Sequence, residues 1–241
     1  MIKSLIFFCT FLTLHASHKI GLCVMATGRY DAYALEMIAS ARHHFCTNHQ
    51  VTYFLFTDSA QIEADDVVQV FQPRFGWPYD TLMRFSIYDA HNELFHDMDF
   101  VFATDADMLF VAPVGDEILE ALVATQHPGF IGKRGSYEKT NKSSTAFVSR
   151  HEGKQYFAGG FYGGSRDEFL KLIAKAKNQI EIDLKKNFIA VWHDESHLNR
   201  YFIDHPPTHI LTPSYCYPES WDLPYEKKLL ALDKNHAKMR N

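Results

Sequence analysis

The chain has 241 residues, of which 46% are hydrophobic and 22% carry charge, and its formal net charge is −5. This composition is typical of a globular domain with a full core, and it excludes a disordered chain. The negative balance offers no basic surface to a phosphate backbone, so we expect no nucleic-acid partner.

The first predicted element is a leader over residues 1–18. Lys3 precedes an apolar stretch, Leu5–Leu14, and the small residues Ala16-Ser17 follow it. This layout is typical of a secretory signal peptide and is shorter than the roughly twenty residues of a membrane span. A short uncleaved anchor or a misassigned start gives the same pattern. The compartment therefore stays open: secretory or membrane-associated if the leader is genuine, cytoplasmic if the start is misassigned.

The next residues alternate between strand and helix patterns. The predicted elements are strands over Ile20–Ala26, Val51–Thr57 and Val67–Phe71, and helices from Asp31 to about Phe45 and from about Thr81 to Phe95. The first two strands are continuous hydrophobic runs, as in sheets that are covered on both faces. The sequence therefore predicts an α/β fold with a mostly parallel central sheet flanked by helices.

The following strand, Phe100–Thr104, ends in Asp105-Ala106-Asp107. Side chains two apart in extended backbone point the same way, so both carboxylates project from the end of a buried strand. Open α/β sheets bind ligands at this end. Mg²⁺ and Mn²⁺ take oxygen ligands and commonly share carboxylates with substrate phosphates. The pair predicts a metal site, and a polar turn is the simpler alternative.

The second half of the chain is less regular. Helices are predicted from Asp116 to about Ala124, from Ser165 to about Asn178 and over Glu195–Ile203, with Pro206-Pro207 ending the last one. Ser136–Lys154 is polar and lacks apolar periodicity, which favours a mobile surface loop. No linker separates the halves, so we expect a single two-lobed domain.

A dense group of titratable residues opens the last predicted helix, in the block Trp192-His193-Asp194-Glu195-Ser196-His197. A carboxylate next to an indole wall suits a sugar-binding pocket. Acidic residues that only stabilise a helix start are the structural alternative. Zinc hydrolases also place histidines four apart, but their glutamate directly follows the first histidine, where Asp194 stands here. A zinc hydrolase is therefore the less favoured function.

Other segments carry weaker signals. Ala158–Gly164 contains two glycine pairs, which indicate either a tight crossover or a pocket floor. The C-terminal cations Lys234, Lys238 and Arg240 are solvated or bind a diphosphate. Arg84 is a charge within an apolar helix pattern, where an exposed position is the simpler interpretation.

The four cysteines, at positions 9, 23, 46 and 216, show no short metal-type spacing. One lies in the leader and leaves an odd number, so we expect buried free thiols rather than a disulfide framework.

Together these segments resemble glycosyltransferase family 6, the family of the blood-group A and B transferases and their bacterial relatives. The resemblance runs from about Lys19 to Asn241, and its most specific motifs are Trp192–Tyr201 and Lys234–Asn241. It implies a GT-A type fold with a nucleotide-binding lobe at about 19–112 and an acceptor-binding lobe at about 113–241. It also implies retaining transfer of N-acetylgalactosamine or galactose from a UDP-sugar to the 3-OH of a fucosylated or plain galactoside, in α-1,3 linkage.

The resemblance assigns donor-side roles by position. It implies that the uridine is held by Met25, Ala26, Thr27 and Tyr30. It places at the diphosphate the residues Asp105, Ala106, Asp107, Lys234 and Arg240. Within that group, Asp105 and Asp107 are the implied ligands of Mn²⁺, with Mg²⁺ as a second candidate. It places around the donor sugar the residues Arg84, Ala158, Gly159, Gly160 and Asp194.

The implied acceptor-binding residues are His127, Trp192, Glu195 and Glu219. Glu195 also matches the residue that acts as nucleophile or as stabiliser of an oxocarbenium-like transition state, and a carboxylate suits either role. The alternative from another class is a catalytically inactive carbohydrate-binding protein, against which the carboxylates of the two acidic motifs argue.

Two features separate this chain from some relatives, the Asp105-Ala106-Asp107 motif and Gly160. Many bacterial members carry Asn-x-Asn in place of Asp105-Ala106-Asp107 and work without metal, so the resemblance implies metal dependence here. Gly160 leaves volume for an N-acetyl group, whereas alanine occurs there in several galactose users. N-acetylgalactosamine is therefore the favoured donor sugar.

Overall fold

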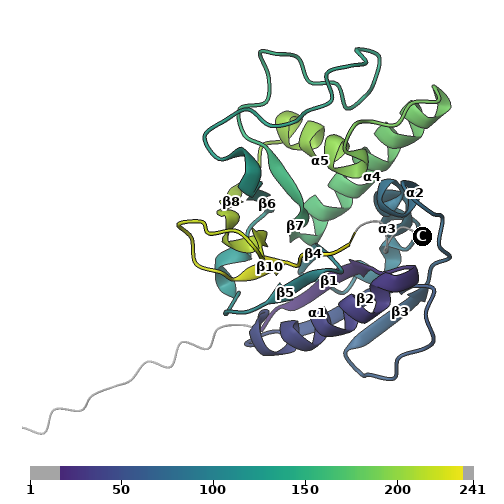
Figure 1. Ribbon diagram of the computed structural model, residues 1–241. Coiled ribbons are helices and arrows are strands. Elements are labelled where there is room, and N and C mark those ends of the chain that lie inside the picture. The colour runs from purple at the N-terminus through teal and green to yellow at the C-terminus, as the bar shows by residue number, and fades with distance from the viewer. Residues whose placement is uncertain (1–16, 236–241) are drawn as a thin grey trace, which may run out of the picture.

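A computed structural model describes residues 17–235 (Figure 1). Most of the predicted leader, Cys9, Lys238 and Arg240 lie outside the described residues. The α-helices are α1 (Asp31–His44), α2 (Tyr79–Leu82), α3 (Arg84–Ala90), α4 (Arg166–Lys185) and α5 (His193–Asp204). Short 3₁₀ turns are η1 (Gly28–Tyr30), η2 (Asn92–Phe95), η3 (Asp116–Ile118), η4 (Pro128–Phe130) and η5 (Pro213–Tyr215).

The strands form one large and one small sheet. The large sheet contains β1 (Lys19–Met25), β2 (Gln50–Thr57), β3 (Val67–Phe71), β4 (Phe100–Asp105), β6 (Leu122–Gln126), β7 (Phe157–Ser165) and β8 (His209–Leu211). Its order is β3-β2-β1-β4-β7-β6-β8, and only the two pairings made by β7 are antiparallel. The small sheet contains β5 (Met108–Phe110), β9 (Tyr217–Pro218) and β10 (Leu229–Ala231). The predicted α/β fold with a mostly parallel central sheet is confirmed.

Helices cover both faces of the large sheet (Figure 1). Helix α1 packs through buried residues at helical spacing, such as Met37 and Ala41, onto the face that carries Leu22 of β1. Helices α3, α4 and α5 pack on the opposite face, where Cys23 of β1 lies. Successive side chains of a strand alternate between faces, so one apolar run fills both cores. The helical covering is why the predicted strands are hydrophobic throughout.

Two predicted helices are wrong in part. The helix expected from Asp116 to Ala124 is only the turn η3, and the strand β6 follows it. The residues of β6 are buried between β7 and β8, and this pairing outweighs the local helix-start signal. The helix expected over residues 81–95 is divided into α2, α3 and η2, with breaks at Met83 and His91.

The glycine-rich segment is an interior strand, β7, rather than a turn. A Cβ atom on Gly163 would lie 2.3 Å from the carbonyl oxygen of Val101, and Gly164 adopts a φ of +140°. The backbone of β7 therefore approaches its neighbours too closely for a side chain at either position. The predicted helix that follows is confirmed and is longer than expected, ending at Lys185, and the predicted last helix is confirmed as α5.

The polar segment predicted as a mobile surface loop is packed against the body of the molecule. Its buried side chains are Tyr137, Glu138, Ser144, Ala146 and Val148. The buried carboxylate of Asp183 in α4 accepts hydrogen bonds from Ser144 Oγ at 2.5 Å and from the Thr145 amide at 2.8 Å. Buried polar groups are stable only when paired, and here the partners come from α4. Polarity in this segment reflects internal hydrogen bonding rather than exposure.

We expect Asp183→Ala to destabilise the protein by about 3 kcal/mol, because two buried donors lose a charged acceptor. Urea unfolding would measure the change. Asp167→Ala serves as the control on the same helix, since that side chain is 70% exposed, and it is expected to cost less than about 1 kcal/mol. Equal losses in the two variants would show that Asp183 does not anchor the loop.

Two further expectations concern the described part of the chain. No helix within residues 17–235 has the length and apolar character needed to cross a bilayer. Cys23, Cys46 and Cys216 are buried free thiols, as predicted.

Candidate active site

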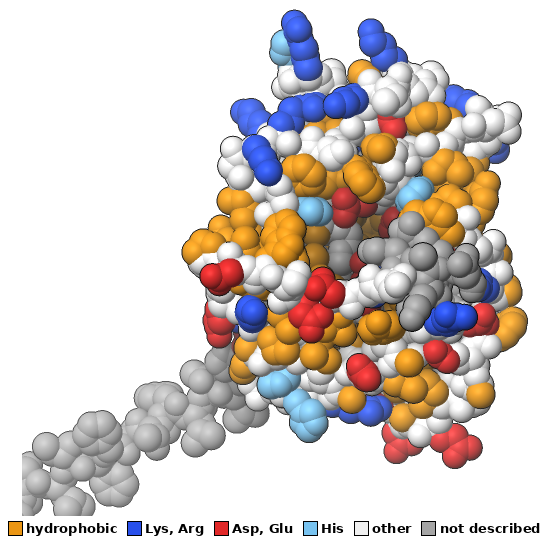
Figure 2. Space-filling view, viewed as in Figure 1, with side chains coloured by type: hydrophobic (Ala, Val, Ile, Leu, Met, Phe, Trp, Pro, Cys, Tyr) orange, Lys and Arg blue, Asp and Glu red, His pale blue; other side chains and the backbone are white. Residues whose placement is uncertain are grey.

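Two adjoining cavities open on one face of the molecule, beyond the carboxyl ends of β1 and β4. Both are lined by Asp105, Asp107 and Lys234. Figure 2 shows acidic side chains in a hollow near the middle of this face, with apolar side chains around it. The parallel register of the two strands places Met25, the last residue of β1, beside Asp105. The predicted ligand-binding end of the sheet is therefore concave.

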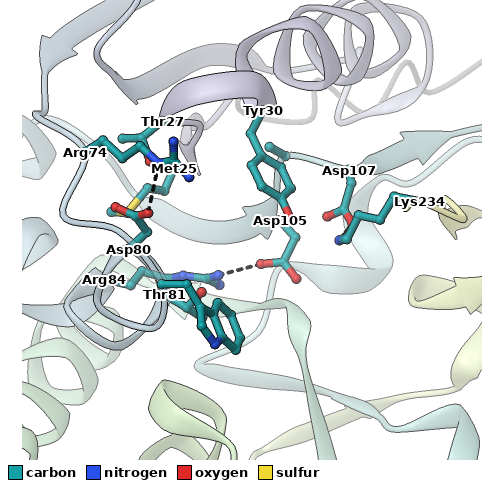
Figure 3. A pocket seen from close by; sticks show the side chains of 12 residues that line it. Met25, Thr27, Tyr30, Arg74, Asp80, Thr81, Arg84, Asp105, Asp107 and Lys234 are labelled. Atoms are coloured by element: carbon teal, nitrogen blue, oxygen red, sulfur yellow. Dashed lines mark hydrogen bonds and ion pairs between the residues drawn. The ribbon is translucent and has the colours of Figure 1, made fainter. Parts of the chain in front are cut away.

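The first cavity collects the residues expected to hold the nucleotide, except two, and one residue expected at the donor sugar, Arg84 (Figure 3). Those expected residues are Met25, Thr27, Tyr30, Arg84, Asp105, Ala106, Asp107 and Lys234. Ala26 is not among the lining residues, because its side chain is fully buried and its amide donates to the Phe56 carbonyl at 2.9 Å. Arg240 lies outside the described residues.

The opposite wall of this cavity comes from a segment that the sequence did not single out. It supplies Arg74, Trp77, Asp80 and Thr81. Asp80 Oδ1 accepts backbone hydrogen bonds from Phe75 and Gly76 at 2.6 and 3.1 Å, which folds the segment into a turn before α2. The indole of Trp77 meets the His193 ring edge-on, with centroids 4.6 Å apart. The turn therefore contacts the start of α5.

Arg84 connects three elements of the site. Its Nη2 donates to Asp105 Oδ1 at 2.6 Å and its Nη1 donates to the Gly159 carbonyl at 3.3 Å. Its Nε lies 3.5 Å from Asp194 Oδ2. Burial opposes the charge, but the carboxylates of Asp105 and Asp194 raise the pKa of Arg84 above its ordinary value. The alternative that Arg84 is an exposed helix residue is wrong, since it is 8% exposed.

Asp194 and Glu195 lie side by side at the start of α5, and both have raised pKa values. Burial raises the pKa of Asp194 to about 6, against the opposing effect of Arg84. Burial raises the pKa of Glu195 to about 7, while hydrogen bonds from the Gly159 amide and the Tyr156 hydroxyl oppose the shift. Glu195 lines the second cavity, whereas Asp194 is buried behind Arg84 and lines neither cavity. A carboxyl group with a raised pKa in a cavity is characteristic of catalytic sites.

The second cavity is lined by Glu195 and, among others, by His127, Ala158, Gly160 and Cys216. Burial lowers the pKa of His127 to about 4, so its imidazole is neutral at physiological pH. His127 Nδ1 accepts a hydrogen bond from the Gly129 amide at 3.0 Å. A neutral ring with an accepting Nδ1 carries its proton on Nε2, where it is a donor.

Of the other expected acceptor residues, Trp192 is 48% exposed at the start of α5, and Glu219 lines neither cavity. The Glu219 carboxylate instead accepts a hydrogen bond from the Asp233 amide at 2.9 Å. Trp221, which the sequence did not single out, lies near η4: a Cβ atom on Gly129 would be 3.9 Å from its indole.

The carboxylates of Asp105 and Asp107 are oxygen donors suited to a hard divalent cation. Within residues 17–235 no three His, Cys, Asp or Glu side chains form a metal-binding group. The pair therefore fits a cation that takes its other ligands from substrate phosphates or water, and does not fit a closed structural site. Lys234 is ion-paired with Asp107, and its Nζ lies 5.4 Å from the centroid of the Tyr30 ring (Figure 3).

The histidine pair does not form a zinc site of the protease type. His197 is buried, and its Nε2 lies 3.9 Å from Asp183 of α4, whereas His193 contacts Trp77. The zinc-hydrolase alternative therefore has no support in the geometry of α5.

A mostly parallel sheet, with a carboxylate pair at the end of β4 and a glycine-lined pocket on the antiparallel neighbour β7, defines a GT-A type fold. The sequence profile of glycosyltransferase family 6 matches residues 10–241. The chain belongs to glycosyltransferase family 6.

Relatives from vertebrates and bacteria agree with this assignment. Histo-blood group ABO system transferase 1 of rat is 36% identical over an alignment of 244 positions, which covers 92% of this chain and 68% of that protein. Globoside alpha-1,3-N-acetylgalactosaminyltransferase 1 of chicken is 30% identical over 239 residues, covering 92% and 69%. The O-antigen biosynthesis glycosyltransferase WbnI of Escherichia coli is 28% identical over 225 residues, covering 89% and 94%. The protein is therefore a glycosyltransferase.

Proposed function

We propose that the protein transfers N-acetylgalactosamine, or galactose, from a UDP-sugar to the 3-OH of a galactoside with retention, forming an α-1,3 linkage. The nucleotide-binding lobe would be about residues 19–112 and the acceptor-binding lobe about 113–241, with Asp194 and Lys234 of the later lobe also reaching the donor. The observation that carries the proposal is the set of contacts made by the Arg84 guanidinium. It binds the Asp105 carboxylate, the Gly159 carbonyl and the Asp194 carboxylate, and so brings the expected diphosphate and donor-sugar residues together. The relatives named above, which include an alpha-1,3-N-acetylgalactosaminyltransferase, support the linkage and the sugar.

On this proposal the first cavity holds the nucleotide. Tyr30 would stack on the uracil ring, beside Met25 and Thr27, and Lys234 would pair with the diphosphate. Arg84 and Asp194 would hold hydroxyls of the donor sugar, since together they present charged donors and acceptors in a largely dry wall.

Asp105 and Asp107 would hold Mn²⁺, or Mg²⁺, against the diphosphate. When bound, the cation would neutralise the negative charge that develops on the departing UDP. Arg84 and Asp194 would then set the position of the donor sugar relative to Glu195. Glu195 and Gly160 both line the second cavity.

Glu195 would act at the anomeric carbon. The bond from that carbon to the UDP oxygen breaks, the bond to the acceptor O3 forms on the same face, and the acceptor proton leaves with UDP. Glu195 either attacks the anomeric carbon and is displaced, or offsets its developing positive charge. His127 Nε2–H, Trp192 and Trp221 would orient the acceptor galactoside, the rings offering apolar faces to the sugar.

Release of UDP from UDP-N-acetylgalactosamine and UDP-galactose tests the proposal, with fucosylated lactose and plain lactose as acceptors. Acceptor-dependent release, with an α-1,3-linked product of retained configuration, is the expected result. A binding protein without catalysis would release no UDP from either donor, and that result would reject the proposed function.

Gly160 offers a test of the donor sugar. A Cβ atom there would lie 3.0 Å from Cys216 Sγ and 3.5 Å from Met108 Sδ, so a methyl group crowds the pocket. We expect Gly160→Ala to lower kcat/KM for UDP-N-acetylgalactosamine about 10-fold more than for UDP-galactose, the usual effect of one added methyl group.

The donor preference would be measured by competition between the two UDP-sugars. Ser165→Ala, at the far end of the same strand and in the lining of neither cavity, is the control and is expected to leave the ratio within about 3-fold of the parent. An unchanged ratio in Gly160→Ala would remove this position from the determinants of donor choice.

A further inference from the structure

Both oxygens of the Glu195 carboxylate are held by donors from one short stretch of chain. The Tyr156 hydroxyl donates to Oε1 at 2.7 Å, and the Gly159 amide donates to Oε2 at 2.8 Å. The stretch is the start of β7, whereas Glu195 lies on α5. Two donors on different oxygens fix the plane of a carboxylate, because rotation about its last bond breaks both.

The backbones that carry these groups are also held together. The side-chain amide of Asn199 donates to the carbonyls of Phe157 and Glu195 at 2.8 and 3.0 Å, and its oxygen accepts from the Phe157 amide at 2.9 Å. Tyr156 and Glu195 therefore start from fixed backbone positions. The hydroxyl of Tyr156 therefore acts, together with the Gly159 amide, on the rotation of the carboxylate and not on the position of the backbone.

The ring of Tyr156 is itself confined. It is 1% exposed and makes edge contacts with Phe130 and Tyr137, at centroid distances of 4.9 and 5.0 Å. A Cβ atom on Gly135 would lie 2.2 Å from the ring, so the loop backbone is pressed directly against it. Phe130, Gly135 and, within the packed segment described above, Tyr137 thus confine the ring of Tyr156.

Tyr156 also contacts the acceptor side of the site. The His127 ring lies 5.6 Å from its ring, and the His127 amide donates to its carbonyl at 2.9 Å. One residue therefore fixes the relation between His127, expected at the acceptor, and Glu195, expected at the donor carbon.

We propose that Tyr156 is a positioning residue for the transfer reaction. It holds the Glu195 carboxylate turned toward the anomeric carbon and at a fixed position relative to His127. This inference rests on the proposed function of Glu195. A carboxylate that can rotate spends part of its time misdirected, and small misplacements of a reacting group are costly to the rate.

Tyr156→Phe tests the inference, with Tyr137→Phe as the matched control. Both tyrosines are buried, their rings touch, and each hydroxyl makes one intramolecular hydrogen bond, but that of Tyr137 goes to the Gln155 carbonyl. We expect Tyr156→Phe to lower kcat about 10- to 100-fold with the donor KM within about 3-fold, the pattern of a group that acts in the transition state. Tyr137→Phe is expected to leave kcat within about 3-fold.

A double-mutant cycle shows whether Tyr156 acts through Glu195. In a Glu195→Gln background, Tyr156→Phe is expected to change the residual rate by less than about 2-fold, because the two residues act as a unit. Equal losses of kcat in Tyr156→Phe and Tyr137→Phe, or full additivity in the cycle, would overturn the inference.

A crystal structure of Tyr156→Phe gives a readout that does not need turnover. The expected result is a Glu195 carboxylate that is rotated or spread over several orientations, beside an unchanged Asn199. A carboxylate that keeps the parent orientation would overturn the inference. Failure of the parent enzyme to use any UDP-sugar would instead reject the proposed function, so the two failures are distinguishable.

Discussion

Replacement of Glu195 by glutamine is expected to lower kcat about 1,000-fold while the protein stays folded. The amide matches the local hydrogen bonds, since its oxygen can accept from the Gly159 amide and its NH₂ can donate to the Tyr156 oxygen. It has no charge with which to stabilise a cationic transition state and no nucleophilic oxygen, and removal of such a group typically costs 10²- to 10³-fold or more. Steady-state UDP release would measure the loss.

Glu93→Gln is the matched control, because Glu93 is exposed on η2. Its activity is expected to equal that of the parent. A Glu195→Gln enzyme as active as the parent would exclude the proposed role of Glu195.

The same variant has a signature in stability. Burial raises the pKa of folded Glu195 to about 7 from an ordinary 4.5, so between these values the folded chain binds more protons than the unfolded one. Stability linked to this group therefore falls as the pH rises through that window. Glutamine removes the dependence, so the variant is expected to gain a few °C in Tm over the parent at pH 8 and little near pH 4.5. A Tm difference that does not change with pH would show that Glu195 titrates normally.

Removal of the carboxylate at position 107 is the second large expected effect. Asp107→Asn is expected to lower transferase activity by at least about 100-fold, because a neutral amide oxygen is a poorer ligand for a hard cation next to a diphosphate. EDTA is expected to abolish the activity of the parent, and added Mn²⁺ to restore it. Electron paramagnetic resonance of Mn²⁺ with UDP would report binding without turnover.

Asp116→Asn is the control for this change, since Asp116 is exposed on η3 and lines neither cavity. It is expected to bind Mn²⁺ and turn over as the parent does. Full activity in EDTA would show that the Asp105–Asp107 pair does not work through a metal.

Local sequence pattern predicts the structure correctly where the final environment of the residues agrees with that pattern. The run before Asp105 is a buried strand because hydrophobic residues continue for its whole length, and the carboxylates follow at the ligand-binding end of the sheet. The block that begins at Trp192 was expected to open a helix, and α5 begins at its second residue. In both places a single element, the strand β4 or the helix α5, determines the backbone conformation and also the direction in which the functional side chains point.

Local sequence pattern does not predict the structure where a partner distant in sequence determines the position of a residue. Glycine disfavours strands, yet β7 is central because its glycines let the backbone reach Val101 and Ala121. Arg84 is buried because carboxylates from β4 and α5 meet its guanidinium, and neither is near it in sequence. Tyr156 bonds a glutamate 39 residues away, and no spacing rule links the two.

The ion pair between Lys234 and Asp107 has a consequence for the order of events at the site. Lys234 follows β10, and the amide of Leu232 donates to the Asp107 carbonyl at 2.9 Å, so the ammonium is kept near this carboxylate. With the roles proposed above, a cation reaching Asp107 alone must compete with an ammonium already in place. A diphosphate gives that ammonium another anion to pair with and vacates the carboxylate. On these roles cation and nucleotide would bind cooperatively, each raising the affinity for the other by the same factor, and Lys234 would neutralise Asp107 until both arrive.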